Sequence, residues 1–149
     1  MEFTMNITFR KCTDKDFEYV YELREKGFRW YLEDILNGWD ENAHKDIIRH
    51  EMAEHLEDMN IIVYKGNDAG LFTYYKDENN SVFIDMIVLE PEYRGMGIGA
   101  SLLQFLIDAY PGVRLYLRTY EKNPARKLYN KFGFKVYDTE TNYVWMELV

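Results

Sequence analysis

PEYRGMGIGASLL, residues 91–103, places glycines at positions 95, 97 and 99 behind an arginine and then continues into an aliphatic pattern typical of a helix. Glycines carry no Cβ, so several consecutive backbone N–H groups can point into one hollow where the helix begins. The helix dipole adds about half a positive charge at the same end. The stretch therefore predicts a loop that binds a phosphate or a pyrophosphate. The structural alternative is a tight strand-to-helix turn that binds nothing.

Two common phosphate-binding motifs can be compared with this loop. The phosphate-binding loop of nucleotidases needs a Lys followed by Ser or Thr after its last glycine, whereas Ala100 and Ser101 stand there. The dinucleotide fingerprint fits better, because Gly95, Gly97 and Ala100 satisfy GxGxxA and Glu121 follows about 20 residues later. An NAD(P)-binding oxidoreductase is therefore the runner-up, although its doubly wound sheet does not agree with the antiparallel hairpins expected before the loop.

The periodicity of the whole chain predicts an α+β fold. The first third is mainly helical, with caps expected at Thr13 and Asp40. A separate short helix is expected in residues 28–39, ended by Asn37 and Gly38. Strands are expected at residues 6–11, 61–66, 70–76, 81–89, 113–119, 135–137 and 143–148, with turns at 66–69 and 77–80. Further helices follow the glycine loop and cover residues 125–130. The order predicts a mixed, mostly antiparallel sheet of about six or seven strands with one strand–helix–strand crossover between parallel strands.

EPEYRGMGIG resembles the acetyl-CoA loop of the GNAT superfamily of N-acetyltransferases, with Arg94, Gly97 and Gly99 filling the signature positions. A second stretch, ENPARKLYNKFGF, resembles the family's later motif through Asn123, Ala125, Tyr129 and the Gly-Phe pair. The two motifs stand in the right order and at the right separation. The resemblance is close over residues 61–134 and implies one GNAT domain over residues 1–149, with the parallel strands splayed at the acetyl-CoA site.

The resemblance also implies acetyl-CoA as the acetyl donor and names the residues that would hold it. The pantetheine arm would lie along the strand backbone, and backbone N–H groups of the loop would bind the pyrophosphate. The expected cofactor-binding residues are Ile87, Val88, Leu89, Arg94, Gly95, Met96, Gly97, Ile98, Gly99, Ala100, Asn123, Ala125, Arg126 and Tyr129. A non-catalytic CoA-binding or interaction module on the same fold is the third candidate.

Three residues are candidates for the catalysis that the resemblance implies. Tyr129 matches the family's acid and would protonate the departing thiolate; the alternative is that Tyr129 only packs. The attacking amine must lose a proton, and Asp85, a charge within an apolar strand, is the first candidate base. An outward-facing strand residue is the alternative for Asp85. Glu41 is the second candidate base.

The acceptor site is expected on the first helices, where aromatic and acidic residues alternate. Phe28, Tyr31 and Trp39 lie close in sequence to Glu41, a mixture suited to a cationic amine with an apolar stem. The predicted partners are therefore acetyl-CoA and a primary amine of a small molecule or peptide. Aromatic residues in the core and acids on the solvated face are the structural alternative.

Composition and charge exclude several classes of function. A net charge of −8 argues against a nucleic-acid partner. The single cysteine and the lack of a long apolar run favour a cytoplasmic protein without a membrane span. The expected oligomeric state is a monomer or a homodimer. HEMAEH resembles a zinc motif, but His50 and His55 are five positions apart and face different sides of a helix, so no metal is expected. The histidines are expected to be solvated, with His44 a remote candidate for the acceptor site.

Overall fold

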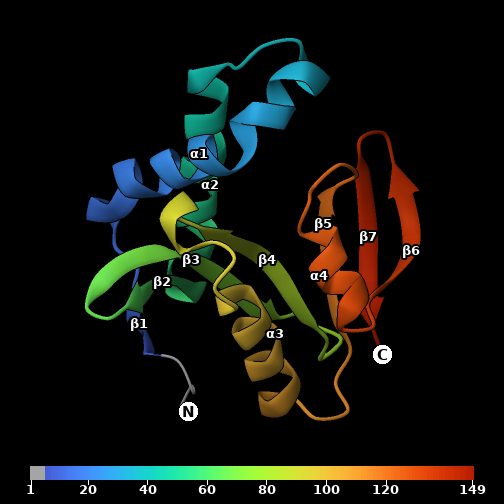
Figure 1. Cartoon of the computed structure of the whole chain (residues 1–149). Coiled ribbons are helices and arrows are strands. Elements are labelled where there is room, and N and C mark those ends of the chain that lie inside the picture. Colours follow the sequence, from blue (N-terminus) through green and yellow to red (C-terminus); the bar gives the residue numbers. More distant parts are fainter. Residues whose placement is uncertain (1–5) are drawn as a thin grey trace. The chain divides into compact units, whose positions relative to one another are not determined.

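The computed structural model describes residues 6–149, drawn in colour in Figure 1. The chain divides into two compact units. The N-terminal unit comprises residues 6–73 and 86–96, and the C-terminal unit comprises residues 74–85 and 97–149. The organisation as one functional domain over residues 1–149 stays a prediction.

Seven strands and four α-helices make up the described chain. They are β1 (Ile7–Lys11), α1 (Phe17–Leu36), α2 (Glu41–His55), β2 (Met59–Tyr64), β3 (Asn67–Lys76), β4 (Val82–Leu89), α3 (Ile98–Ala109), β5 (Leu115–Tyr120), α4 (Arg126–Lys131), β6 (Lys135–Glu140) and β7 (Tyr143–Leu148), with single 3₁₀ turns η1 (Asp14–Asp16), η2 (Leu56–Asp58) and η3 (Pro91–Tyr93). Within residues 6–149, no helix combines the length and the apolar composition needed to cross a membrane.

The strand order, β1-β2-β3-β4-β5-β7-β6, confirms the predicted mixed sheet. Neighbouring strands pair antiparallel at β1–β2, β2–β3, β5–β7 and β6–β7. β4 and β5 pair in parallel, with Val82, Phe83 and Ile84 opposite Leu115, Tyr116 and Leu117. The predicted crossover through α3 therefore joins two parallel strands, and the α+β assignment is confirmed.

α1 is one continuous helix, so the prediction of a separate short helix over residues 28–39 was wrong. Gly27 lies in its middle, and a Cβ there would be 2.8 Å from Val88 Cγ2. The glycine therefore allows the helix to approach β4 closely and does not interrupt it. α1 ends where the sequence predicted, because Asn37 adopts the left-handed conformation with φ 57° and Gly38 follows with φ 131°.

The N-terminal unit contains a bulge on β3. Ile62 pairs with Gly70 and Val63 pairs with Asp68, which leaves Ala69 as the extra residue. The carbonyl oxygen of Ala69 accepts a hydrogen bond from the Glu90 backbone N–H at 2.8 Å, and this bond ties the bulge to the residue after β4. The turn between β2 and β3 is shorter than the predicted 66–69, because β3 already begins at Asn67.

The C-terminal unit packs α3 through an aliphatic face. Ile98, Leu102, Leu103 and Leu106 are buried, whereas Ala109 at the end of the helix is exposed. Figure 1 shows β7 between β5 and β6, in agreement with the pairing of these strands. β6 is the last strand of the sheet, and all of its residues are exposed.

Cys12 lies directly after β1 and is 4 % exposed. Its Sγ donates a hydrogen bond to the carbonyl oxygen of Thr13 at 3.6 Å. Burial raises the pKa of the Cys12 thiol to about 11, so the thiol is protonated at neutral pH.

Candidate functional site

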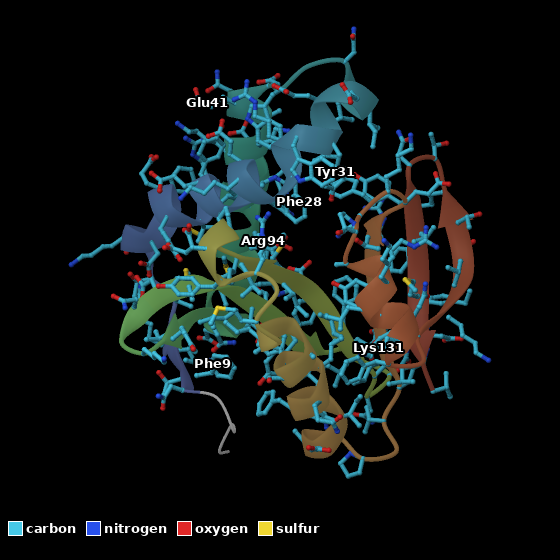
Figure 2. All side chains as sticks on the ribbon, in the orientation of Figure 1. Phe9, Phe28, Tyr31, Glu41, Arg94 and Lys131 are labelled. Carbon is cyan, nitrogen blue, oxygen red and sulfur yellow. The ribbon has the colours of Figure 1, made fainter. Side chains whose placement is uncertain are left out.

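Arg94 holds the start of the glycine loop in place. η3 follows β4 directly, and the Arg94 side chain folds back from it. Its Nε donates to the Leu89 carbonyl oxygen at 3.2 Å, and its Nη2 donates to the Lys26 carbonyl oxygen at 3.4 Å. Figure 2 labels Arg94 on this loop. The guanidinium thus ties the loop to the end of β4 and to α1, both in the N-terminal unit.

Gly95 and Gly97 have the backbone geometry that an anion-binding loop needs. Their φ angles are 75° and 87°, and a Cβ on either residue would meet nothing within 4 Å. Gly97 is the N-cap of α3, whose first N–H groups have no partner within the helix. The open space at the two glycines and the N–H groups left without a helical partner together fit an anion at the beginning of α3.

The other residues of the loop differ in how far they are buried. A Cβ on Gly99 would lie 3.1 Å from Leu128 Cδ2, so the lack of a side chain at this third glycine lets α3 pack closely against α4. Ile98 is buried, Ala100 is half-buried and Met96 is exposed. The Ile98 side chain therefore serves the packing of α3, and a contact of Ile98 with a cofactor stays a prediction.

Asn123 organises the turn between β5 and α4. Its Nδ2 donates to Thr119 Oγ1 at 2.8 Å, and its Oδ1 accepts from the Ala125 backbone N–H at 2.9 Å. Arg126 Nη1 donates to the Glu121 carbonyl oxygen at 2.8 Å. The second motif therefore has a local structural function, and its contacts with a cofactor stay a prediction.

Tyr129 lies on α4 with only 6 % of its surface exposed. Its ring packs against Phe134 with 5.9 Å between ring centroids. Burial raises the pKa of the phenol to about 12. At neutral pH the hydroxyl therefore carries its proton, as a general acid must before it reacts.

β4 carries the predicted residues for the cofactor arm and the first candidate base. Asp85 is half-buried and belongs to the C-terminal unit. Val88 is buried, whereas its neighbours Ile87 and Leu89 are half-buried, as expected from the alternation of side chains along a strand. The roles of these residues stay predictions.

Two of the four predicted acceptor residues lie together on α1. Phe28 and Tyr31 are buried, and their rings meet edge to face with centroids 6.1 Å apart. Glu41 is exposed as the first residue of α2 and lies 3.6 Å from Lys45 Nζ. Figure 2 shows Glu41 well apart from Phe28 and Tyr31, within the same unit. Phe28 and Tyr31 therefore lie together, whereas Glu41 does not lie beside them.

Trp39 and His44 form a stacked pair that was not predicted from the sequence. Their rings are 3.6 Å apart and nearly parallel, at 8°. Trp39 Nε1 donates to Tyr21 Oη at 2.9 Å, and His44 Nδ1 accepts from Arg24 Nε at 2.9 Å. His44 is 4 % exposed, so the expectation that it is solvated was wrong. Burial, with the nearby Arg24 cation, lowers the pKa of His44 to about 4.

This buried neutral histidine predicts acid sensitivity of the folded state. As the pH falls, the unfolded chain binds a proton at a histidine near pH 6.5, about 2.5 units before folded His44 does. The free energy of unfolding should therefore fall by about 2 kcal/mol from pH 7 to pH 5 on account of this one group. His44→Gln keeps an acceptor for Arg24 but cannot titrate, so most of this fall should disappear.

Urea unfolding at both pH values measures the effect. His50→Gln is the matched control, because His50 is exposed on the same helix. Equal pH dependence in the wild type and in His44→Gln would contradict the assignment.

The two remaining histidines of α2 lie beside acidic side chains, and both are within 4.0 Å of Glu54. His50 Nε2 lies 3.4 Å from Glu54 Oε1, and His55 Nδ1 lies 3.4 Å from Asp58 Oδ2. Across residues 6–149, no group of three His, Cys, Asp or Glu side chains is arranged to hold a metal ion.

Two hollows adjoin α1 and α2 in the N-terminal unit. The outer one, about 390 Å³, lies at the α1–α2 connection and includes Trp39 and His44 in its wall. The inner one is a cavity of about 40 Å³ between the helices and β2, β3 and β4. Its lining residues are Val20, Arg24, Ile47, Ile48, Glu51, Met59, Leu71, Thr73, Met86 and Val88. None of the four predicted acceptor residues lines this inner cavity.

The polar residues of the inner cavity were not predicted from the sequence. Arg24 follows Val20 and Tyr21 at helical spacing, and Glu51 follows Ile48 by three positions on α2. A charge within an apolar stripe costs free energy unless it has a partner or a function. The position of Arg24 and Glu51 within apolar stripes could have identified both residues as candidates. No neighbouring residues in the sequence identify Thr73 in this way.

Solved structures of low sequence identity share the fold. An acetyltransferase from Thermus thermophilus aligns with a TM-score of 0.74 at 18 % identity and covers 97 % of each chain. The PaiA N-acetyltransferase from Thermoplasma acidophilum, solved in complex with coenzyme A, aligns with a TM-score of 0.71 at 22 % identity, over 96 % of this chain and 98 % of that one.

One curated relative is more similar in sequence over a shorter stretch. The spermine/spermidine N(1)-acetyltransferase of Bacillus subtilis is 36 % identical over 73 residues, which is 44 % of this chain and 48 % of the relative. The match thus spans about half the length of that protein. The model of the acetyltransferase (GNAT) family matches residues 17–134, which include the glycine loop and the second motif. The chain belongs to the acetyltransferase (GNAT) family.

Proposed function

We propose that this chain transfers an acetyl group from acetyl-CoA to a primary amine, acting as a monomer or homodimer. The observation that carries the proposal is the pair of left-handed glycines, Gly95 and Gly97, facing open space at the beginning of α3 in a chain of this family. Backbone N–H groups over residues 94–100 would bind the pyrophosphate of the donor. The backbone of Ile87, Val88 and Leu89 would hold its pantetheine arm.

The reaction is a direct attack in a ternary complex. The amine nitrogen forms a bond to the thioester carbonyl carbon, and the carbon–sulfur bond breaks. The amine proton passes to a base, for which Asp85 is the first candidate and Glu41 the second. Tyr129 gives its proton to the departing thiolate, in keeping with its protonated state at neutral pH.

We propose a linear aliphatic polyamine as the acceptor. The Bacillus subtilis relative is a spermine/spermidine N(1)-acetyltransferase, and the shared stretch is 36 % identical. The net charge of −8 would favour the approach of a polycation to this chain. Peptide N-termini and aminoglycosides are the alternatives that the assay below separates.

The test follows acetyl-CoA consumption and free thiol release across polyamines, amino acids, aminoglycosides and peptides. Turnover with spermidine well above that with the other amines is the expected result. A chain that binds CoA and acetylates none of these amines would instead be the non-catalytic module. Stabilisation by NAD(P)H and not by CoA would favour the oxidoreductase.

Gly97→Val should weaken CoA binding at least tenfold. A β-branched residue resists φ 87°, and a cost of about 1–2 kcal/mol for this conformation would shift the loop and its amides. Isothermal titration with CoA measures the change. Gly66→Val is the matched control, because Gly66 has φ 83° and equally open surroundings in the β2–β3 turn. CoA affinity equal to that of the wild type would place the pyrophosphate elsewhere.

A further inference from the structure

The inner cavity contains two buried oxygens that have no hydrogen-bond partner among the described residues. They are Glu51 Oε1, contributed by α2, and Thr73 Oγ1, contributed by β3. Thr73 is fully buried, at 0 % exposure. Buried polar atoms in native proteins nearly always have a partner, because leaving one without costs free energy. The two oxygens therefore indicate that the cavity receives a hydrogen-bonding group.

The rest of the lining is mainly apolar. Val20, Ile48, Met59, Leu71, Met86 and Val88 supply aliphatic and thioether surface around the two oxygens. Arg24 also lines the cavity, and its Nε is engaged with His44 Nδ1 at 2.9 Å. A group suited to this space has a polar end and an apolar stem.

The volume limits the size of that group. One water molecule needs about 10–15 Å³ of cavity volume. The inner cavity, at about 40 Å³, therefore holds roughly three non-hydrogen atoms, each about the size of a water oxygen. One amino nitrogen with its first two methylene carbons fits this limit. A whole acceptor molecule or a sugar ring does not.

The chemistry of the two oxygens selects a donor of hydrogen bonds. Burial raises the pKa of the Glu51 carboxyl, whereas a cation placed beside it would favour the ionised form. An ionised carboxylate only accepts, and a threonine hydroxyl can accept as well. An alkylammonium group supplies three N–H donors and a charge opposite to that of Glu51. A carboxylate or phosphate would place a like charge beside Glu51 and leave its oxygen without a donor.

An ammonium held in this way would be an anchor and not the nucleophile. An amine must lose its proton before it attacks a thioester, whereas pairing with a carboxylate favours the protonated form. The cavity does border β4, through Met86 and Val88, and these residues alternate with Ile87 and Leu89 along the strand. An acceptor anchored here would thus begin beside the strand to which the pantetheine arm is assigned.

We infer that the inner cavity binds the non-reacting terminal amino group of a linear aliphatic diamine or polyamine, with Glu51 and Thr73 accepting its hydrogen bonds. The inference rests on the proposed function, because an anchor for a second amino group has a role only if the chain acetylates an amine. It assigns Glu51 and Thr73 as specificity-determining residues that select acceptors with a second amino group.

Direct binding tests this assignment without any turnover, so failure of acetyl transfer would leave its result intact. Isothermal titration compares putrescine, a linear diamine, with butylamine, the monoamine of the same carbon chain, in the presence of saturating CoA and in its absence. We expect putrescine to bind the wild type at least tenfold more tightly than butylamine. Glu51→Gln should remove that preference, and Thr73→Val should reduce it severalfold while keeping the side-chain shape.

The matched control is Glu54→Gln, the same change on an exposed position of α2. It should keep the preference of the wild type, and far-ultraviolet circular dichroism verifies that all three variants are folded. If putrescine and butylamine bind the wild type equally, or if Glu51→Gln and Thr73→Val both retain the preference, the cavity holds only water and the inference is overturned. If Glu51→Gln does not fold, Thr73→Val alone decides by the same criterion.

Discussion

Gly70→Ala should lower the free energy of unfolding by about 3 kcal/mol or more, because β3 and β4 leave no room for a side chain at this position. A Cβ on Gly70 would lie 2.3 Å from the Val88 carbonyl oxygen and 3.1 Å from Leu89 Cα. Both are backbone atoms, so no rotation of a flexible side chain can relieve the clash. The strand pair must separate where the bulge at Ala69 and its hydrogen bond to Glu90 hold it together.

Urea unfolding of the wild type and of Gly70→Ala measures the loss. Gly66→Ala is the control, since a Cβ there meets nothing within 4 Å and only the cost of φ 83°, about 1 kcal/mol, is expected. The displaced backbone of Val88 and Leu89 should also weaken CoA binding in any folded fraction. A loss below 1 kcal/mol in Gly70→Ala would show that β4 shifts at little cost.

Tyr129→Phe should lower kcat about a hundredfold and leave the affinity for CoA within twofold of the wild type. General acid catalysis contributes about 10²–10⁴ to a rate, and the substitution removes only the hydroxyl. The ring keeps its buried position and its contact with Phe134, so the fold around α4 should not change.

Steady-state kinetics with spermidine, together with titration of CoA, separates the two effects. Tyr137→Phe is the matched control, because Tyr137 is exposed on β6 and loses the same atom. An unchanged kcat in Tyr129→Phe would remove this phenol from the mechanism and leave it a packing residue.

Features encoded by neighbouring residues could be predicted from the sequence. Asp40 caps α2 by accepting from the Ala43 N–H at 3.1 Å, as its position before the helical pattern indicated. Asn37 and Gly38 end α1 at the predicted place, and Gly95 and Gly97 have the expected left-handed conformation. In each case the determining contacts lie within a few positions along the chain.

Features that depend on distant parts of the chain could not be predicted. The aromatic segment from residue 28 suggested a separate helix, but α1 continues through Gly27, where the lack of a side chain admits Val88 from β4. His44 follows polar residues and looked solvated, yet Trp39 stacks on it and Arg24 bonds to it. Glu51 on α2 and Thr73 on β3 line one cavity, and each has a buried oxygen without a hydrogen-bond partner among residues 6–149. None of these contacts has a signature in the local pattern.

The burial of Cys12 decides which chemical assay suits this protein. With a pKa of about 11, only about one thiol in a thousand is ionised at pH 8, where sulfhydryl reagents are commonly used. The sequence contains no other cysteine. A chromogenic disulfide reagent added to a reaction mixture should therefore report coenzyme A alone, without background from the enzyme and without inactivating it.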